Sequence, residues 1–317
     1  MRYISELHEG DSLSDIYLCK FRQQLTTRNG KAYLNVILMD KTGTLDAKIW
    51  EPNSSAISDF DVLDYIYVFG EVTSYQGALQ ASVKRVKKAQ DGEYIPADYL
   101  PTSPYDIEEM YQKLKAVIDT VKNPHLHLLL TKMLIEDKEV VEKFKSFSAA
   151  KTVHHSFVGG LLQHTLAVVR LCKFYTKAYP ALNHDLLIAA AILHDVGKTR
   201  EFTPFPQNDY TDAGQLLGHI VMGSEMIGKA AHEIPDFPEK LLRELQHCIL
   251  AHHGEYEFGS PKKPALMEAV ALNFADNTDA KMEIMTELFA PLTVEKKDAW
   301  LGYNRLFETN VRKTGEW

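Results

Sequence analysis

A proline-rich stretch, DGEYIPADYLPTSPYD, separates two parts of the chain that have different hydrophobic periodicities. Before it, apolar and polar residues alternate in short segments, which predicts strands; after it, apolar residues recur every three or four positions, which predicts helices. Because a segment with one period cannot bury its apolar side chains in the other structure, we expect a multi-domain α+β chain. Its predicted parts are an all-β domain over residues 1–92, a linker and helical connector over 93–149, an all-α domain over 150–285 and a helical tail over 286–317.

The first part of the chain predicts a small barrel. Asn29-Gly30 and Gln76-Gly77 stand between runs of strand-forming residues, and Asn-Gly is the pair most typical of a tight hairpin turn. Several short strands joined by such turns favour an OB-like barrel, a fold that often binds single-stranded nucleic acid.

The charge of the chain limits which partners are plausible. The net charge is −8, which excludes a wholly basic nucleic-acid binder but leaves room for a local basic groove. Candidate groove residues are Arg22, Arg28, Lys31, Lys48 and the run VKRVKK. Candidate base-stacking residues are Tyr33, Trp50, Tyr67 and Tyr75. The alternative is that the aromatic residues lie in the barrel core and the basic residues face solvent.

Histidine and aspartate residues recur inside the apolar, helix-patterned segments of the second part. They are His164, His194, Asp195, His219, His252, His253 and Asp276. A single histidine in an apolar helix is more often a hydrogen-bonded core residue than a ligand, but a carboxylate such as Asp276 is costly there unless a cation or hydrogen bonds compensate it. Mixed nitrogen and oxygen donors suit Mn²⁺, Fe²⁺ or another first-row divalent ion. We therefore expect these side chains to converge on a metal site.

The ordered set H…HD…D, formed by His164, His194-Asp195 and Asp276, resembles the HD-domain metal-dependent phosphohydrolase superfamily over residues 150–285. The context HDVGK is similar too. Together with the barrel, the helical connector, the segment HHSFVGGLLQHT and the tail, nearly the whole chain resembles the YhaM-type 3′→5′ exoribonuclease family. This resemblance implies a bacterial enzyme that requires a divalent metal, typically Mn²⁺, and acts on single-stranded RNA and also on single-stranded DNA.

The resemblance also suggests a role for each residue of the set. A first ion would be held by His164, His194, Asp195 and Asp276, and a second by Asp195, His219 and His252, with His253 as a further ligand or a phosphate contact. Two such ions, about 3.5–4 Å apart, activate water and clamp a phosphodiester during in-line displacement. We expect Asp195 to bridge them as the catalytic carboxylate.

Residues around this set have two interpretations each. Lys198 would act in catalysis by neutralising a phosphate oxygen; the alternative is a helix-end charge favoured by the dipole. His154 and His155 would contact substrate phosphate, or simply start a helix. For Asp279, an ordinary salt bridge with Lys281 is favoured over a role in orienting a ligand.

Three functions stay open at this point. The first is a divalent-metal-dependent 3′→5′ exoribonuclease, the second an HD-type phosphohydrolase of small nucleotides or cyclic dinucleotides, and the third a non-catalytic RNA-binding protein with a vestigial HD fold. Three widely spaced cysteines without a CxxC pair fit a reducing cytoplasm, and we expect no membrane span. The aromatic C-terminal residues would dock either on the chain's own core or on a second copy in a homo-oligomer.

Overall fold

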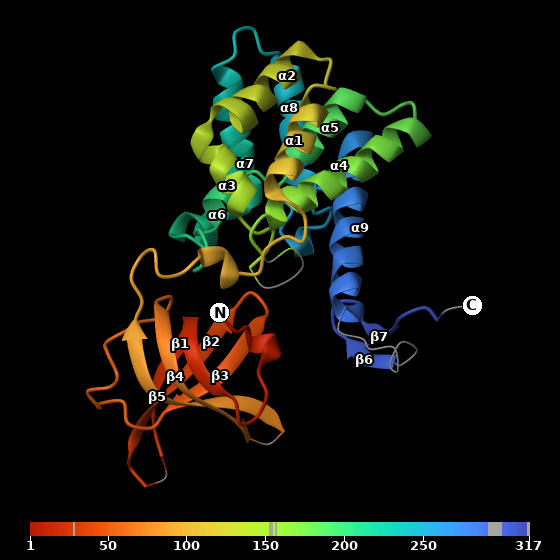
Figure 1. Ribbon diagram of the computed structural model, residues 1–317. Coiled ribbons are helices and arrows are strands. Elements are labelled where there is room, and N and C mark those ends of the chain that lie inside the picture. The colour runs from red at the N-terminus through yellow and green to blue at the C-terminus, as the bar shows by residue number, and fades with distance from the viewer. Residues whose placement is uncertain (28, 76, 152–154, 156, 291–299, 316–317) are drawn as a thin grey trace.

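The computed structural model describes residues 1–317 except 28, 76, 152–154, 156, 291–299 and 316–317. It has a barrel at the N-terminus and a helical body after it, as the change in hydrophobic periodicity predicts (Figure 1). A long last helix extends out of that body and leads to a short hairpin near the C-terminus.

The barrel contains strands β1 (Ser12–Thr26), β2 (Ala32–Asp40), β3 (Gly43–Ile49), β4 (Tyr65–Tyr75) and β5 (Ala78–Lys88). The strand order β1-β2-β3-β5-β4 closes because β1 pairs with both β2 and β4. This arrangement confirms the OB-like barrel. Burial alternates along β2, where Leu34, Val36 and Leu38 point into the core, and Gly30 has the positive φ expected in the turn before β2.

The helical body begins with α1 (Ile107–Ile118), α2 (Pro124–Thr131) and α3 (Lys138–Ser146), and continues with α4 (Gly160–Ala178), α5 (His184–Leu193) and α6 (Lys198–Glu201). It ends with α7 (Asp212–His232), α8 (Glu239–Ala251) and α9 (Met267–Phe289). Asp106 caps α1 and Asn123 caps α2 through side-chain hydrogen bonds, so a new helix begins at Pro124. The expected connector is no separate unit, since the apolar faces of α1 to α3 share one hydrophobic core with α4, α5, α7, α8 and α9.

Helix α5 lies in the middle of this core. All its residues from Leu186 to Leu193 are buried, so this part of the helix has no solvent-facing side. Its C-terminal end therefore lies in the interior of the helical body, and so do His194 and Asp195, which follow it.

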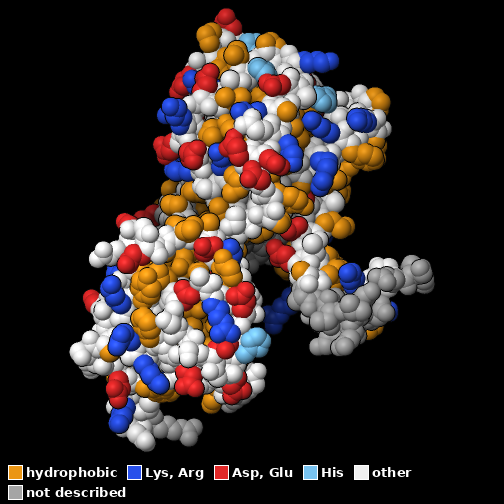
Figure 2. All heavy atoms as spheres, in the orientation of Figure 1, with side chains coloured by type: hydrophobic (Ala, Val, Ile, Leu, Met, Phe, Trp, Pro, Cys, Tyr) orange, Lys and Arg blue, Asp and Glu red, His pale blue; other side chains and the backbone are white. Residues whose placement is uncertain are grey.

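The barrel and the helical body meet through a second apolar cluster. Ile16 and Leu18 of β1 pack with Tyr99 and Leu100 of the linker, and Val158 and Phe205 of the helical body contact the same cluster. Acidic and basic side chains are interspersed over both parts on the face shown in Figure 2, in keeping with the absence of a uniformly basic sequence. Among the described residues, no helix has the length and apolarity required to cross a bilayer.

The prediction of a helical tail over 286–317 holds for residues 286–289 and is wrong for residues 300–312. Helix α9 ends at Phe289, and β6 (Trp300–Asn304) pairs with β7 (Thr309–Arg312) as an antiparallel hairpin. Gly302 has a φ of +87°, which a helix cannot accommodate, and aromatic residues favour strands. The spacing of Trp300, Tyr303 and Phe307 imitates a helical period over too few residues to be decisive.

Candidate metal centre

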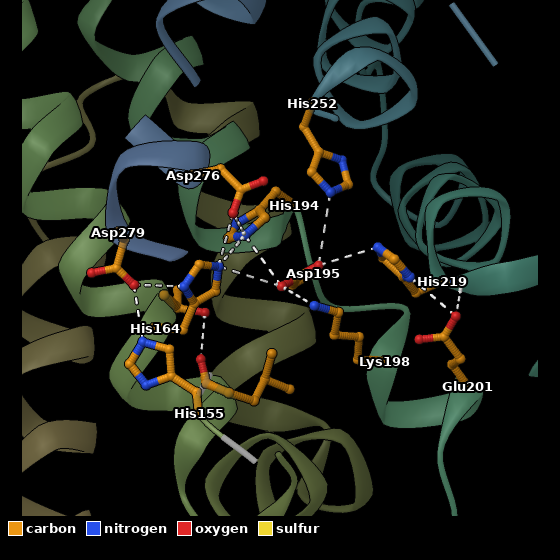
Figure 3. Close-up of polar contacts among 12 residues, drawn as sticks. His155, His164, His194, Asp195, Lys198, Glu201, His219, His252, Asp276 and Asp279 are labelled. Carbon is orange, nitrogen blue, oxygen red and sulfur yellow. Dashed lines mark hydrogen bonds and ion pairs between the residues drawn. The ribbon is translucent and has the colours of Figure 1, made fainter. Parts of the chain in front are cut away.

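The histidine and aspartate side chains predicted from the sequence converge at one place inside the helical body (Figure 3). Helix α4 contributes His164, and α9 contributes Asp276. His194 caps the C-terminal end of α5 and Asp195 follows it in a tight turn. His219 lies on α7, and His252 and His253 follow α8.

Gly197 allows the turn after His194-Asp195 to contact helix α7. A Cβ at this position would lie 2.0 Å from the carbonyl oxygen of His219 and 2.7 Å from the backbone nitrogen of Gly223. No larger residue fits without moving one of the two segments. The glycine of the HDVGK sequence is thus required because the turn carrying Asp195 packs directly on the backbone that carries His219.

A first group of ligand atoms is formed by His164, His194 and Asp276. The Nε2 atom of His164 lies 3.1 Å from Nε2 of His194 and 3.1 Å from Oδ1 of Asp276. Oδ2 of Asp195 is 3.3 Å from Nε2 of His194 and 3.6 Å from Nε2 of His164. Ligands on one ion with bonds of about 2.0–2.2 Å are separated by about 3 Å, so these distances suit a shared cation.

A second group is formed by His219, His252 and His253. The other carboxylate oxygen of Asp195, Oδ1, lies 3.4 Å from Nε2 of His219 and 3.8 Å from Nε2 of His252. The ring of His253 lies 4.3 Å from that of His252 and 5.2 Å from that of His219, between centroids. Asp195 therefore stands between the two groups and presents one oxygen to each (Figure 3).

The hydrogen bonds of the rings determine which atoms face the centre. Each of five histidines has its Nδ1 atom beside a backbone carbonyl or a carboxylate, which can only accept, so Nδ1 carries the proton. The partners are Asp279 for His164, Ala191 for His194, Glu201 for His219, Ile249 for His252 and Phe258 for His253. Each ring therefore offers Nε2 to a metal, and the centre is rich in acceptors.

Among the residues that the structure describes, three buried polar atoms at the centre have no hydrogen-bond partner: Oδ1 of Asp195, Nε2 of His219 and Nε2 of His252. The Nε2 atoms of His219 and His252 lie 3.4 and 3.8 Å, respectively, from Oδ1 of Asp195. Buried polar atoms without a partner are costly, and acceptors facing acceptors repel. A cation between them removes both penalties, so the residues present fit a divalent metal.

The pKa values of the centre reflect the same excess of acceptors. Burial lowers the pKa of His252 well below its usual value, and His253 beside it adds to the effect. Burial also opposes protonation of His164, but hydrogen bonds to Asp276 and Asp279 outweigh it and raise its pKa to about 10. Without a metal, His164 therefore holds a proton where a metal would bind.

Lys198 lies closer to the centre than a helix-end charge would. Its Nζ atom is 2.7 Å from Oδ2 of Asp195, and its side chain is 12% exposed. Burial alone would raise the pKa of Asp195, but Lys198 and His194 hold it well below its usual range. Lys198 therefore neutralises the central carboxylate and stands at the edge of the centre.

The expected salt bridge between Asp279 and Lys281 is wrong. Residues two positions apart point away from one another on a helix, and Oδ2 of Asp279 instead lies 2.8 Å from Nδ1 of His164 and 3.0 Å from Nε2 of His155. Its spacing of one turn from Asp276 was the sequence signal for this position. Glu201, which contacts His219, was missed because nothing local in the sequence connects residues 18 positions apart.

The expected phosphate contacts at His154 and His155 have different outcomes. His154 lies outside the described residues. His155 is 1% exposed and is hydrogen-bonded to Asp279, behind the ring of His164. This placement argues against a phosphate contact, because the side chain faces the interior of the helical body.

The candidate barrel residues are dispersed. Arg22 forms an ion pair with Asp61 at 3.4 Å and lies over the ring of Phe60, while Lys31 is exposed next to the turn and Arg28 is outside the described residues. Lys48 binds Asp46 and Asn35 on the outer face.

Two of the aromatic candidates lie together on that outer face. Trp50 is 49% exposed, and its ring centroid lies 5.1 Å from that of Tyr33. Tyr67 is half-buried against the cluster between barrel and helical body, and Tyr75 is exposed at the end of β4. Trp50 and Tyr33 therefore form an aromatic pair on the outer face of the barrel.

Comparisons with known proteins agree with the division of the chain into a barrel and a helical body. Residues 161–281 match the family described as the HD domain, and residues 20–89 match the OB-fold nucleic acid binding domain. The chain is 36% identical over 273 residues to a protein of Geobacillus sp. (strain WCH70) named 3′-5′ exoribonuclease YhaM. That alignment covers 86% of this chain and 83% of the relative.

Solved structures resemble the barrel only distantly. The second OB-fold domain of replication protein A from Methanococcus maripaludis is 19% identical with a TM-score of 0.24, covering 29% of this chain and 96% of that one. A mitochondrial single-stranded DNA binding protein of S. cerevisiae is 11% identical with a TM-score of 0.21, covering 27% of this chain and 100% of that one. The assignment of the barrel thus depends on its strand order and on the family match.

Proposed function

Since this chain belongs to the YhaM family of 3′→5′ exoribonucleases, we propose that it shortens single-stranded RNA from the 3′ end by hydrolysing phosphodiester bonds at the histidine–aspartate centre. The observation that carries this proposal is the set of three unpartnered buried atoms on Asp195, His219 and His252, which lies beside the ligand group of His164, His194 and Asp276.

The ligand assignment follows from which oxygen of Asp195 faces which group. His164, His194 and Asp276 with Oδ2 of Asp195 would hold one ion; His219 and His252 with Oδ1 would hold the other, and His253 completes that side. When bound, two divalent ions supply an activated water and stabilise the charge that develops on the phosphate. We propose Mn²⁺ for both positions, because mixed imidazole and carboxylate donors suit it, with Fe²⁺ or another first-row ion as the alternative.

Three side chains have further roles in this proposal. Asp195 keeps the two ligand groups at a fixed separation. Lys198, already 2.7 Å from that carboxylate, neutralises negative charge when a phosphate enters. On the barrel, Trp50 and Tyr33 stack on bases, while Lys48 lies between Asp46 and Asn35 on the same outer face and reaches the phosphate backbone.

The proposed substrate, cellular location and oligomeric contacts are more specific than the family assignment. We propose single-stranded RNA as the main substrate and single-stranded DNA as a second one, since stacking and backbone contacts distinguish the two sugars poorly. We also propose a cytoplasmic enzyme, in keeping with three free, buried cysteines. The exposed Trp300 and Tyr303 of the hairpin are where we would place contacts between copies in a homo-oligomer.

The test incubates the purified protein with Mn²⁺ and a 5′-labelled single-stranded RNA, in parallel with deoxynucleotides and a cyclic dinucleotide. Stepwise shortening of the labelled RNA is the expected result. Turnover of the small nucleotides with intact RNA would instead identify a small-molecule phosphohydrolase. Retention of RNA on a filter without turnover under any metal would identify a binding protein.

The matched variant is Asp195→Ala. It should abolish shortening, because both ions lose a shared ligand, and it should leave RNA retention unchanged, because the barrel does not contain Asp195. Normal cleavage by this variant would refute the site assignment.

A further inference from the structure

Two of the five histidines at the centre have a carboxylate as the partner of Nδ1, whereas the other three have a backbone carbonyl. His164 donates to Asp279 at 2.8 Å, and His219 donates to Glu201 at 3.1 Å. These two histidines belong to different ligand groups. Each group therefore contains one histidine whose outer partner carries a full negative charge.

We propose that Asp279 and Glu201 are a pair of positioning residues, one for each metal, that fix the ring orientation and strengthen the metal bond of His164 and His219 respectively. This inference rests on the proposed two-metal function. Neither carboxylate faces the substrate: each acts through the histidine it holds. A carboxylate partner makes the opposite ring nitrogen more basic, and its loss commonly lowers metal affinity or activity about 10–100-fold.

Asp279 is itself held in place from behind. Its Oδ2 atom accepts hydrogen bonds from both His164 and His155, and its side chain is 14% exposed. His155 has a φ of +56° and is 1% exposed, a backbone conformation that is costly for a non-glycine residue. The strained backbone is consistent with a ring that must reach Asp279, so His155 supports the carboxylate that supports His164 (Figure 3).

Glu201 holds both the ring and the backbone of His219. Gly218 interrupts helix α7 with φ 72° and ψ 158°, so the N–H of His219 leaves the helical hydrogen-bond pattern. That N–H donates to Oε1 of Glu201 at 2.9 Å, and Nδ1 of the ring donates to the same oxygen. One carboxylate oxygen therefore fixes both the backbone and the ring of His219.

Removing the carboxylate of Asp279 or Glu201 should have a different effect from removing one partner of an ordinary structural ion pair. A structural pair holds helices together and affects stability alone. A positioning carboxylate affects the affinity of one ion and leaves the other. The location of each carboxylate on a different ligand group makes the two variants complementary controls.

The experiment titrates metal-free protein with Mn²⁺ and counts bound ions by electron paramagnetic resonance, without substrate. Wild type should bind two ions with the spectrum of a magnetically coupled pair. Asp279→Ala and Glu201→Ala should each lower the affinity for one ion about 10–100-fold, giving the uncoupled spectrum of one bound ion at intermediate Mn²⁺.

The Asp279→Asn and Glu201→Gln variants retain an acceptor but not the charge, so their Mn²⁺ affinity should lie between those of the alanine variants and wild type. The Glu225→Gln variant, an exposed carboxylate on α7, should match wild type.

Several outcomes would overturn the inference. One is two ions bound with wild-type affinity in all four variants. Another is loss of both ions together in either alanine variant, which would refute the one-to-one pairing. If an alanine variant does not fold, the same electron paramagnetic resonance measurement on the Asn or Gln variant tests the inference. RNA shortening is measured separately: wild-type protein that binds two ions but leaves RNA intact would refute the proposed function and leave this inference standing.

Discussion

At the scale of single residues, the centre is organised around one carboxylate and one cation. Asp195 faces both ligand groups, and the amine of Lys198 lies 2.7 Å from one of its oxygens. Because both side chains are almost fully buried, their charges interact in a low dielectric and are far more strongly coupled than a surface pair. The same arrangement makes the role of Lys198 testable by removing its charge alone.

Lys198→Met should lower kcat about 10²–10³-fold, the usual cost of losing one group that stabilises transition-state charge. Methionine preserves the apolar stem, so packing and the binding of two Mn²⁺ ions should persist. The measurement is single-turnover cleavage of labelled RNA together with the ion count. Arg200→Met, an exposed cation on the same short helix, is the control, and equal rates in the two variants would contradict the role.

His164 should make the stability of the metal-free protein depend on pH. Its pKa is raised to about 10 in the folded chain by Asp276 and Asp279, against 6.5 when unperturbed. A raised pKa contributes stability that is fully present below pH 6.5 and is lost as the pH rises through about 10. Urea unfolding in the presence of a chelator should therefore show a falling midpoint over this range.

The His164→Gln variant provides the comparison for that measurement, because it cannot take up the proton. Its unfolding midpoint should fall less than that of wild type between pH 6.5 and 10. Parallel curves for the two proteins would show that other groups cause the dependence. Saturating Mn²⁺ should also flatten the wild-type curve, since metal and proton compete for the same ring.

At the scale of elements, close backbone contacts decide where the ligands stand. Helix α5 is buried from Leu186 to Leu193 and brings His194 and Asp195 to the interior, and Gly197 lets the following turn touch α7. The break at Gly218 then turns His219 toward Glu201. Each ligand is thus placed by how two elements meet, and a change at their contact should affect both folding and metal binding.

Gly197→Ala should destabilise the protein by about 1–3 kcal/mol or more, because its Cβ would meet the His219 carbonyl at 2.0 Å. The displaced turn should also weaken the ion near His219. Chemical denaturation and the Mn²⁺ count are the two measurements. Gly228→Ala, on α7, meets only the end of the flexible Gln246 side chain and should stay within about 1 kcal/mol of wild type. Equal stability of both variants would contradict the packing argument.

At the scale of the whole molecule, the OB-fold barrel and the candidate metal centre belong to different parts of the chain. The barrel has its own core, and the metal centre lies wholly within the helical body. An apolar cluster containing Leu18, Leu100 and Phe205 joins the two. A substitution on the outer face of the barrel should therefore alter RNA affinity without altering the centre.

Trp50→Ala should weaken RNA binding by about 1–3 kcal/mol, the typical cost of losing one stacking platform. Affinity is measured at fixed salt in the Asp195→Ala background, so that cleavage does not interfere. In otherwise wild-type protein, KM should rise while the bound Mn²⁺ stays at two ions. Phe174→Ala removes an aromatic residue that is 62% exposed on α4 and serves as the control. A Trp50 variant with the affinity of this control would refute the stacking role.

The sequence by itself determined the order of the two folds and most of the candidate ligand set. Strand and helix periodicities are local, so they change visibly at the proline-rich stretch, and a histidine or aspartate in an apolar segment stands out by its chemistry alone. His164, His194, Asp195, His219, His252, His253 and Asp276 therefore could be named, and the structure brings them together.

Only the tertiary structure decided what holds those ligands. Asp279 and Glu201 reach His164 and His219 from positions 115 and 18 residues away in the chain. The one-turn spacing from Asp276 marks Asp279 without identifying its partner, and nothing local marks Glu201. The C-terminal hairpin was not predicted because the spacing of three aromatic residues is too short a pattern to distinguish a helix from strands. Residue type shows that a metal can be bound, whereas the packing of α4, α7 and α9 determines which carboxylate orients which ring.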